Sequence, residues 1–119
     1  MDGNYNNLVN LLRDLGELGE ARNVYDEALK ICKALMAETG SIKDRRELGS
    51  SYYNLGILLR KLGELSEARN AFAKELELRE ALMAETKAIK DKRDLADSYN
   101  DLGLLLGDLG KLSEAQKSV

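Results

Sequence analysis

The apolar residues of this chain recur at the spacing of one face of an α-helix. Between residues 48 and 62 they lie three or four positions apart, at Leu48, Tyr52, Leu55, Leu58, Leu59 and Leu62. A second stretch follows Gly63 with Ala68, Phe72, Leu76, Ala81 and Leu82, and we expect that helix to run to about Thr86. Leu, Ala, Glu and Lys dominate, whereas β-branched residues are few and scattered, so no strand is expected.

Glycines and small polar residues mark the ends of the predicted helices. Gly63 suits the left-handed position that ends a helix, and we expect Ser66 to be the N-cap of the helix that follows. Earlier in the chain, Gly40 and Ser41 read as a helix stop followed by a new N-cap. The later link, Thr86-Lys87-Ala88, lacks both residues, so it is either tighter or its helix boundary is shifted by a few residues.

The chain repeats itself with a period of 47 residues. Tyr5, Tyr52 and Tyr99 are evenly spaced, and 27 of 47 positions agree between residues 5–51 and 52–98. This similarity predicts one domain, residues 1–119, with repeat 1 at about 5–51, repeat 2 at about 52–98 and a partial repeat 3 at about 99–119. The last helix, from about Leu112 to Val119, would be short.

A single helix pair has too little apolar surface to fold alone, but stacked neighbours bury a continuous core. We therefore predict an all-α fold of antiparallel helix-turn-helix repeats stacked into a right-handed α-solenoid. Identical units joined identically rotate by a constant angle, which gives the array one concave and one convex face.

Composition excludes several classes of function. The chain has no His and one Cys, so it lacks an imidazole base, a disulfide and a CxxC pair. Its net charge of -3 has the wrong sign for holding nucleic acid. No apolar stretch reaches the ~18 residues needed to cross a membrane, and the N-terminus is not a signal peptide. We expect no enzymatic activity, no cofactor, no metal, no nucleic acid or membrane partner, and a cytoplasmic location, since the lone thiol suits a reducing compartment.

The repeated residues resemble the tetratricopeptide repeat family over nearly the whole chain. In repeat 2 the matching residues are Tyr52, Leu55, Gly56, Leu59, Gly63, Ala68 and Phe72. In repeat 1 they are Tyr5, Leu8, Leu12, Gly16, Ala21, Tyr25 and Ala28, and in repeat 3 Tyr99, Leu102, Gly103, Leu106, Gly110 and Ala115.

The chain also departs from the family pattern. The period exceeds the usual 34 residues, as in long-helix variants such as kinesin light chain repeats. Val9 replaces the first conserved glycine in repeat 1, and Glu75 stands where the family has a small Ala between the two helices of a pair. No proline ends a repeat.

The resemblance implies a peptide-binding groove on the concave face, lined by the first helix of each pair. The groove residues that it implies here are Asn6, Asn7, Asn10, Arg13, Tyr53, Asn54, Ile57, Arg60, Asn100, Asp101 and Leu104. Asn7 and Asn54 share one column, which Asp101 continues, and an Asn side chain pairs with both polar groups of a peptide backbone. The alternative is that these asparagines cap turns or face water.

Charged residues refine the expected ligand. One end of the groove would be basic through Arg13, Arg60 and Lys61, which favours an acidic ligand. The alternative is that these cations face water at a helix C-terminus, where positive charge is favourable. Asp97 and Asp101 stand where the family's clamp for a terminal carboxylate needs cations, so no such clamp is expected.

The repeat pattern also predicts the environment of the tyrosines and of Cys32. Tyr5, Tyr52 and Tyr99 are expected in the core, with Tyr53 the better ligand contact. Cys32 is expected to be partly exposed because its repeat equivalent is Arg79.

The sequence therefore predicts a scaffold or adaptor that binds a peptide segment of a partner protein. The alternative is a self-associating structural repeat unit, or an engineered or excised repeat fragment, that forms a homo-oligomer through an uncapped C-terminal end.

Overall fold

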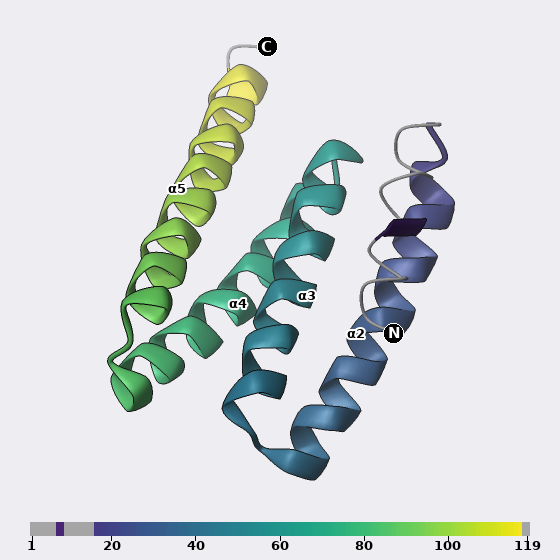
Figure 1. Ribbon diagram of the computed structural model, residues 1–119. Helices are drawn as coiled ribbons and strands as arrows, with labels where there is room; N and C mark the ends of the chain where they lie inside the picture. Colours follow the sequence, from purple (N-terminus) through teal and green to yellow (C-terminus); the bar gives the residue numbers. More distant parts are fainter. Residues whose placement is uncertain (1–6, 9–15, 118–119) are drawn as a thin grey trace.

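Four helices build the part of the chain that the structure describes. The computed structural model describes residues 7–8 and 16–117, and the helices are α2 (Leu18–Thr39), α3 (Ile42–Lys61), α4 (Leu65–Thr86) and α5 (Ile89–Lys117). They run alternately down and up in Figure 1, and each packs on the next one along the chain. The all-α class and the antiparallel helix-turn-helix units are thus confirmed.

Residues with a left-handed backbone end the helices where the sequence indicated. Gly40, which follows α2, has φ of 59°, and Gly63, which follows α3, has φ of 79°. The equivalent of Gly40 in the next repeat, Lys87, adopts φ of 53°. Lys87 therefore adopts a left-handed backbone that is strained for a residue with a side chain, and the link keeps the shape that it has at Gly40.

The two long links are built alike. Thr39 donates a hydrogen bond to Asp44 at 2.5 Å, and Ser41 accepts one from the Asp44 amide at 3.1 Å. In the next repeat Thr86 donates to Asp91 in the same way, and the two helices α2 and α4 end at equivalent residues. The expectation of a tighter or shifted second link is wrong, because the threonine and the aspartate that shape the link are present in both copies.

Two helix boundaries differ from expectation. Helix α4 begins at Leu65 with Glu64 as N-cap and no side-chain cap, so Ser66 is not the N-cap. Gly110 is equivalent to Gly63, yet α5 continues through it to Lys117 without a turn. Gly110 is not among the described glycines with positive φ, so its backbone does not adopt the left-handed turn that Gly63 makes.

The core lies where α2, α3, α4 and α5 meet. Its largest fully buried side chains include Phe72, Leu58, Leu82 and Leu105. Gly56 lets α3 approach α4, since a Cβ there would lie 2.6 Å from an atom of the Phe72 ring.

Three residues have a different environment from the one that periodicity predicted. Cys32 is buried rather than partly exposed, because it packs in a cluster with Leu48 and Tyr52. Tyr99 is 53% exposed, because none of the four described helices packs over its ring as helices pack over Tyr52, which is buried. Ala81 is exposed, because the side of α4 that packs inward instead carries Ala71, Glu75 and Arg79.

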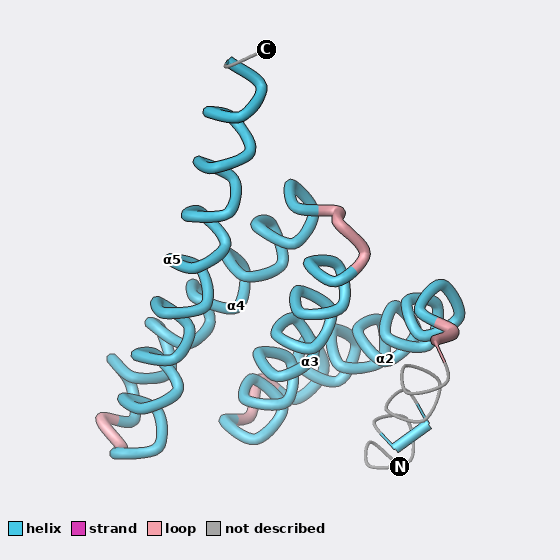
Figure 2. The backbone as a smooth tube through the Cα atoms, turned by 90° about the horizontal axis from the view of Figure 1, so that it is seen from above, coloured by secondary structure: helices cyan, strands magenta, loops and turns pink. Residues whose placement is uncertain are grey.

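The helices form an elongated, open array (Figure 2). The principal extents are 51 × 33 × 21 Å, and the radius of gyration is 15.3 Å. A compact domain of this length would have a radius of about 13.5 Å. This shape leaves much of α5 exposed, including Tyr99, Leu104 and Leu106.

Candidate functional site

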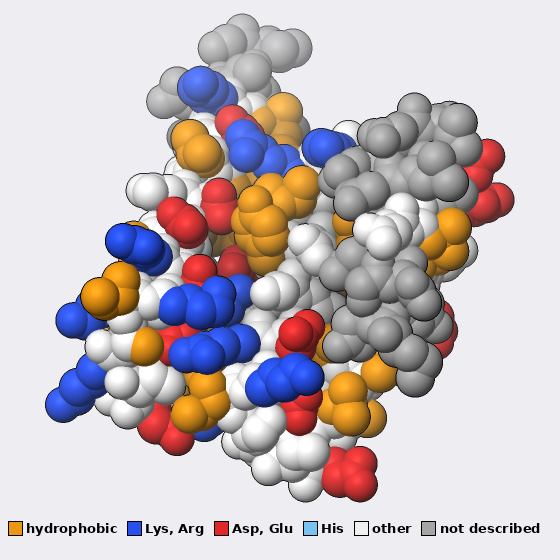
Figure 3. Space-filling view, viewed as in Figure 1, with side chains coloured by type: hydrophobic (Ala, Val, Ile, Leu, Met, Phe, Trp, Pro, Cys, Tyr) orange, Lys and Arg blue, Asp and Glu red, His pale blue; other side chains and the backbone are white. Residues whose placement is uncertain are grey.

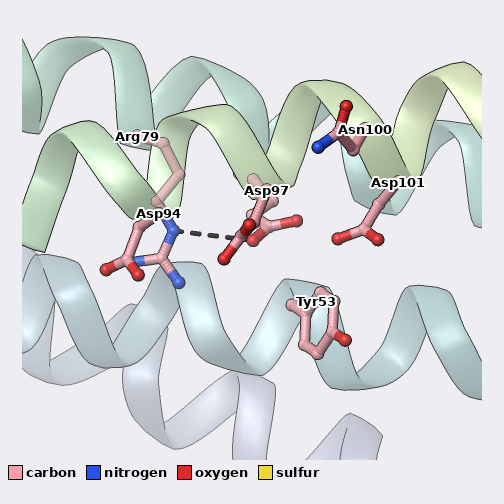
Figure 4. Close-up of a pocket in the computed structure, with 7 residues that line it drawn as sticks. Tyr53, Arg79, Asp94, Asp97, Asn100 and Asp101 are labelled. Carbon is pink, nitrogen blue, oxygen red and sulfur yellow. Dashed lines mark ion pairs between the residues drawn. The ribbon is translucent and has the colours of Figure 1, made fainter.

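A cavity of about 310 Å³ opens between α3, α4 and α5. Its lining residues are Tyr53, Glu75, Arg79, Asp94, Asp97, Asn100 and Asp101. In Figure 4 Asp97 and Asp101 lie on the side of α5 that faces Tyr53 on α3, whereas the Asp94 carboxylate lies beside the Arg79 head group. Figure 3 shows acidic and basic side chains gathered on this face of the molecule.

Helical spacing places the carboxylates together. Asp94, Asp97 and Asp101 are three and four residues apart, so they follow one side of α5. Glu75 and Arg79 are four residues apart on α4 and form the floor of the cavity. Three helices from two successive repeats therefore contribute to one site.

Glu75 and Arg79 are a buried charged pair. The Glu75 and Arg79 side chains are 5% and 7% exposed, and Arg79 Nε lies 3.5 Å from Glu75 Oε2. Arg79 also lies 3.7 Å from Asp94. The equivalent residues of the first repeat are Ala28 and Cys32, so the second repeat has exchanged two small residues for an ion pair.

A glycine makes room for this pair. A Cβ on Gly49 would lie 2.9 Å from Arg79 Cζ, so the guanidinium lies directly against the backbone of α3. Arg79 Nη2 also donates to the hydroxyl of Ser50 at 3.3 Å. The position of the Arg79 head group is thus set by three helices.

The surroundings of the cavity disfavour negative charge. Burial raises the pKa of Glu75 to about 7, against the opposing effect of Arg79, and Asp101 and Asp94 add to the rise. Burial, then the charge of Asp97, raises the pKa of Asp101. Burial is also the largest cause of the raised pKa of the Tyr53 hydroxyl, and the charges of Asp101, Glu75 and Asp97 add to it.

Two arginines of α3 tether α5 at either end of the cavity. Arg46 donates to both oxygens of the fully buried Asp91, at 3.0 and 2.7 Å. This pair, helped by Thr86, lowers the pKa of Asp91 to about 2 although burial opposes the change. At the other end Arg60 donates twice to Asp108, at 3.0 and 2.6 Å. Arg60 is therefore engaged between repeats and adds little positive charge for a ligand.

The residues that the resemblance implied are only partly brought together. Tyr53, Asn100 and Asp101 line the cavity, and Leu104 is 59% exposed one turn farther along α5. Ile57 packs partly against the core, and Asn54 is partly buried on α3. Asn7 lies in a short exposed helical segment of described residues, whereas Asn6, Asn10 and Arg13 lie outside them.

Four lining residues were not among the predicted groove residues: Glu75, Arg79, Asp94 and Asp97. A signal for two of them was present in the sequence. The paired change from Ala28 and Cys32 to Glu75 and Arg79, four residues apart, is typical of a compensating charge pair.

The geometry defines an open helical-repeat domain with a polar groove. A family model described as tetratricopeptide repeat matches residues 3–81, and a second model with the same description matches residues 96–119. The chain belongs to the tetratricopeptide repeat family. Domains of this family are generally protein-protein interaction modules and are typically non-catalytic. No curated protein and no solved structure matches the chain.

Within residues 7–8 and 16–117 no helix combines the length and apolar character needed to cross a bilayer. Among the same residues no group of three or more Cys, Asp or Glu side chains is arranged to hold a metal ion.

Proposed function

We propose that this domain is a non-catalytic scaffold that binds a peptide segment of a partner protein in the groove between α3 and α5. The observation that supports it most is the cavity between the first helices of two successive repeats, floored by α4. The helices α2, α3 and α4 have 20 to 22 residues, which fits the long-helix variant of the family that the 47-residue period indicates.

Polar and aromatic groups at this cavity suit an extended peptide. Asn100 is exposed on α5 and offers both a donor and an acceptor. Tyr53 is 36% exposed and packs against Phe72 with 6.4 Å between ring centroids. A ring held by the core supplies contact area at low entropic cost.

Selection from a random peptide library, followed by mapping on the ¹⁵N-labelled protein by NMR, tests this proposal. We expect selected peptides to shift the resonances of α3 and α5 around Tyr53 and Asn100. The variants Tyr53→Ala and Asn100→Ala should each weaken binding. Asn23→Ala, at an exposed position on α2 that does not line the cavity, should not. Peptides that bind only at other helix faces would refute the groove.

A second candidate is self-association through the outer side of α5. Tyr99 and Leu106 lie seven residues apart on that side and are 53% and 47% exposed. Their equivalents Tyr52 and Leu59 are 7% and 2% exposed. A second copy packed on this surface would bury Tyr99 and Leu106, as their equivalents on α3 are buried. Light scattering over a concentration series tests it: a mass that stays monomeric, or that Leu106→Glu leaves unchanged, would contradict it.

A further inference from the structure

The cavity between α3, α4 and α5 holds more negative than positive charge. Four carboxylates line it, and Arg79 is the one cation among its lining residues. Arg79 lies 3.5 Å from Glu75 and 3.7 Å from Asp94, longer than the ~2.7–2.9 Å of a strong charge-assisted hydrogen bond. Asp97 and Asp101 form no ion pair with any described residue.

A second observation at the floor of the cavity is independent of the charge count. Glu75 Oε1 is buried and has no hydrogen-bond partner among the described residues, although its side chain is only 5% exposed. A buried carboxylate oxygen without a donor is costly, because it has lost water and gained nothing. A ligand group with N–H donors would satisfy that oxygen.

We propose that this cavity receives a cationic side chain, arginine in preference to lysine, from the partner peptide. This inference rests on the proposed function and names the chemistry of the ligand. A guanidinium has five N–H donors in a plane, so it can pair with more than one carboxylate at once. The ring of Tyr53 at the same cavity offers a face on which a guanidinium stacks.

The volume and the tethers are consistent with one inserted side chain. At about 310 Å³ the cavity is at the small end of ligand pockets, which span about 300–1,000 Å³. The pairs Arg46–Asp91 and Arg60–Asp108 hold α3 and α5 together at the two ends, so the carboxylates between them are presented at a set spacing. The favoured ligand is therefore basic, opposite to the acidic one that Arg13, Arg60 and Lys61 favoured from sequence.

The experiment is an NMR titration of the full ¹⁵N-labelled chain with a short neutral peptide, acetyl-GSGRGSG-amide. Matched peptides carry lysine, citrulline or glutamate at the central position. We expect the arginine peptide to shift the resonances of residues 94–101 and of Tyr53 saturably, the lysine peptide less, and the citrulline and glutamate peptides not at all. Equal shifts from arginine and uncharged citrulline would overturn the proposal.

Two double variants with the same change in net charge sharpen the test. Asp97→Asn with Asp101→Asn should weaken binding of the arginine peptide by about tenfold or more, because two charge partners are lost. Glu38→Gln with Glu77→Gln, both exposed and away from the cavity, should change it by less than about twofold. Equal affinity of both double variants would refute the site. Removing two like charges relieves repulsion, so thermal unfolding should show the first variant folded.

The outcomes separate this inference from the function on which it rests. If selected acidic or apolar peptides shift the residues around Tyr53 and Asn100 but the arginine peptide does not, the cationic ligand is wrong and the groove stands. If no peptide shifts these residues, both are wrong.

Discussion

Replacing Glu75 with Gln should stabilise the domain at neutral and alkaline pH. The folded carboxyl has a pKa of about 7 against an ordinary value of 4.5, chiefly because burial disfavours its charge. Between these pH values the folded protein binds more protons than the unfolded one, so the free energy of unfolding falls as pH rises from about 4.5 to about 7. The amide introduced by Glu75→Gln would keep the shape of the neutral side chain without this titration.

The size of the effect follows from the two pKa values. Their difference corresponds to about 3 kcal/mol once the carboxyl is fully ionised. Typical domains have ~5–15 kcal/mol of total stability, so the change is large. The groups that face Glu75 remain in Glu75→Gln: Arg79 on its own helix, Tyr53 on α3, and Asp94 and Asp101 on α5.

Urea unfolding followed by circular dichroism at 222 nm, from pH 4.5 to 8.5, measures this. We expect Glu75→Gln and the parent chain to be about equally stable near pH 4.5 and to differ by about 3 kcal/mol above pH 7. Glu77→Gln, exposed on the same helix, is the control and should run parallel to the parent. If Glu75→Gln also ran parallel to the parent over the whole range, the reasoning about the buried carboxyl would be refuted.

Three other predictions concern the repeat fold. Gly56→Ala should cost about 1–3 kcal/mol of unfolding free energy in urea, because its Cβ would lie 2.6 Å from a buried aromatic ring. Gly63→Ala should destabilise by about 1–2 kcal/mol because φ is 79°, whereas Gly110→Ala, in a helix with open space around it, should stabilise by up to about 1 kcal/mol; equal effects of the two would contradict the unbroken α5. Arg46→Ala should lower the free energy of unfolding at pH 7. It should also make that free energy fall less between about pH 4 and 2, because in the parent chain the fall comes from protonating Asp91, whose pKa is about 2. Urea unfolding at a series of pH values with the same fall in both proteins would contradict this.

The local signals in the sequence predicted the repeat and most helix ends. Gly40 and Gly63 carry their own conformational preference, and the apolar period places Tyr52 and Phe72 in the core without knowledge of neighbours. Gly110 shows the limit of this reasoning. It matches Gly63 in sequence, yet it lies inside α5 with open space around it, so the residue type alone does not end a helix.

The candidate site was only partly predictable, because it depends on residues from three helices. The resemblance pointed to Tyr53, Asn100 and Asp101, which line the cavity. It did not point to Glu75 and Arg79, because periodicity within one helix does not show which side its neighbours will cover. Three of the four carboxylates follow one side of α5 in the sequence, but only the packing of α4 and α5 on α3 shows that they share a cavity with Glu75.

The arginine pairs that join residues 45 or 48 positions apart make the links between repeats sensitive to salt. Arg22–Glu67, Arg46–Asp91 and Arg60–Asp108 each link successive repeats, and several of these side chains are partly accessible to water. Dissolved ions screen such pairs more strongly as their concentration rises. Added salt should therefore weaken the links at Arg22–Glu67 and Arg60–Asp108 more than the link at Arg46–Asp91, because the Asp91 carboxylate is fully buried.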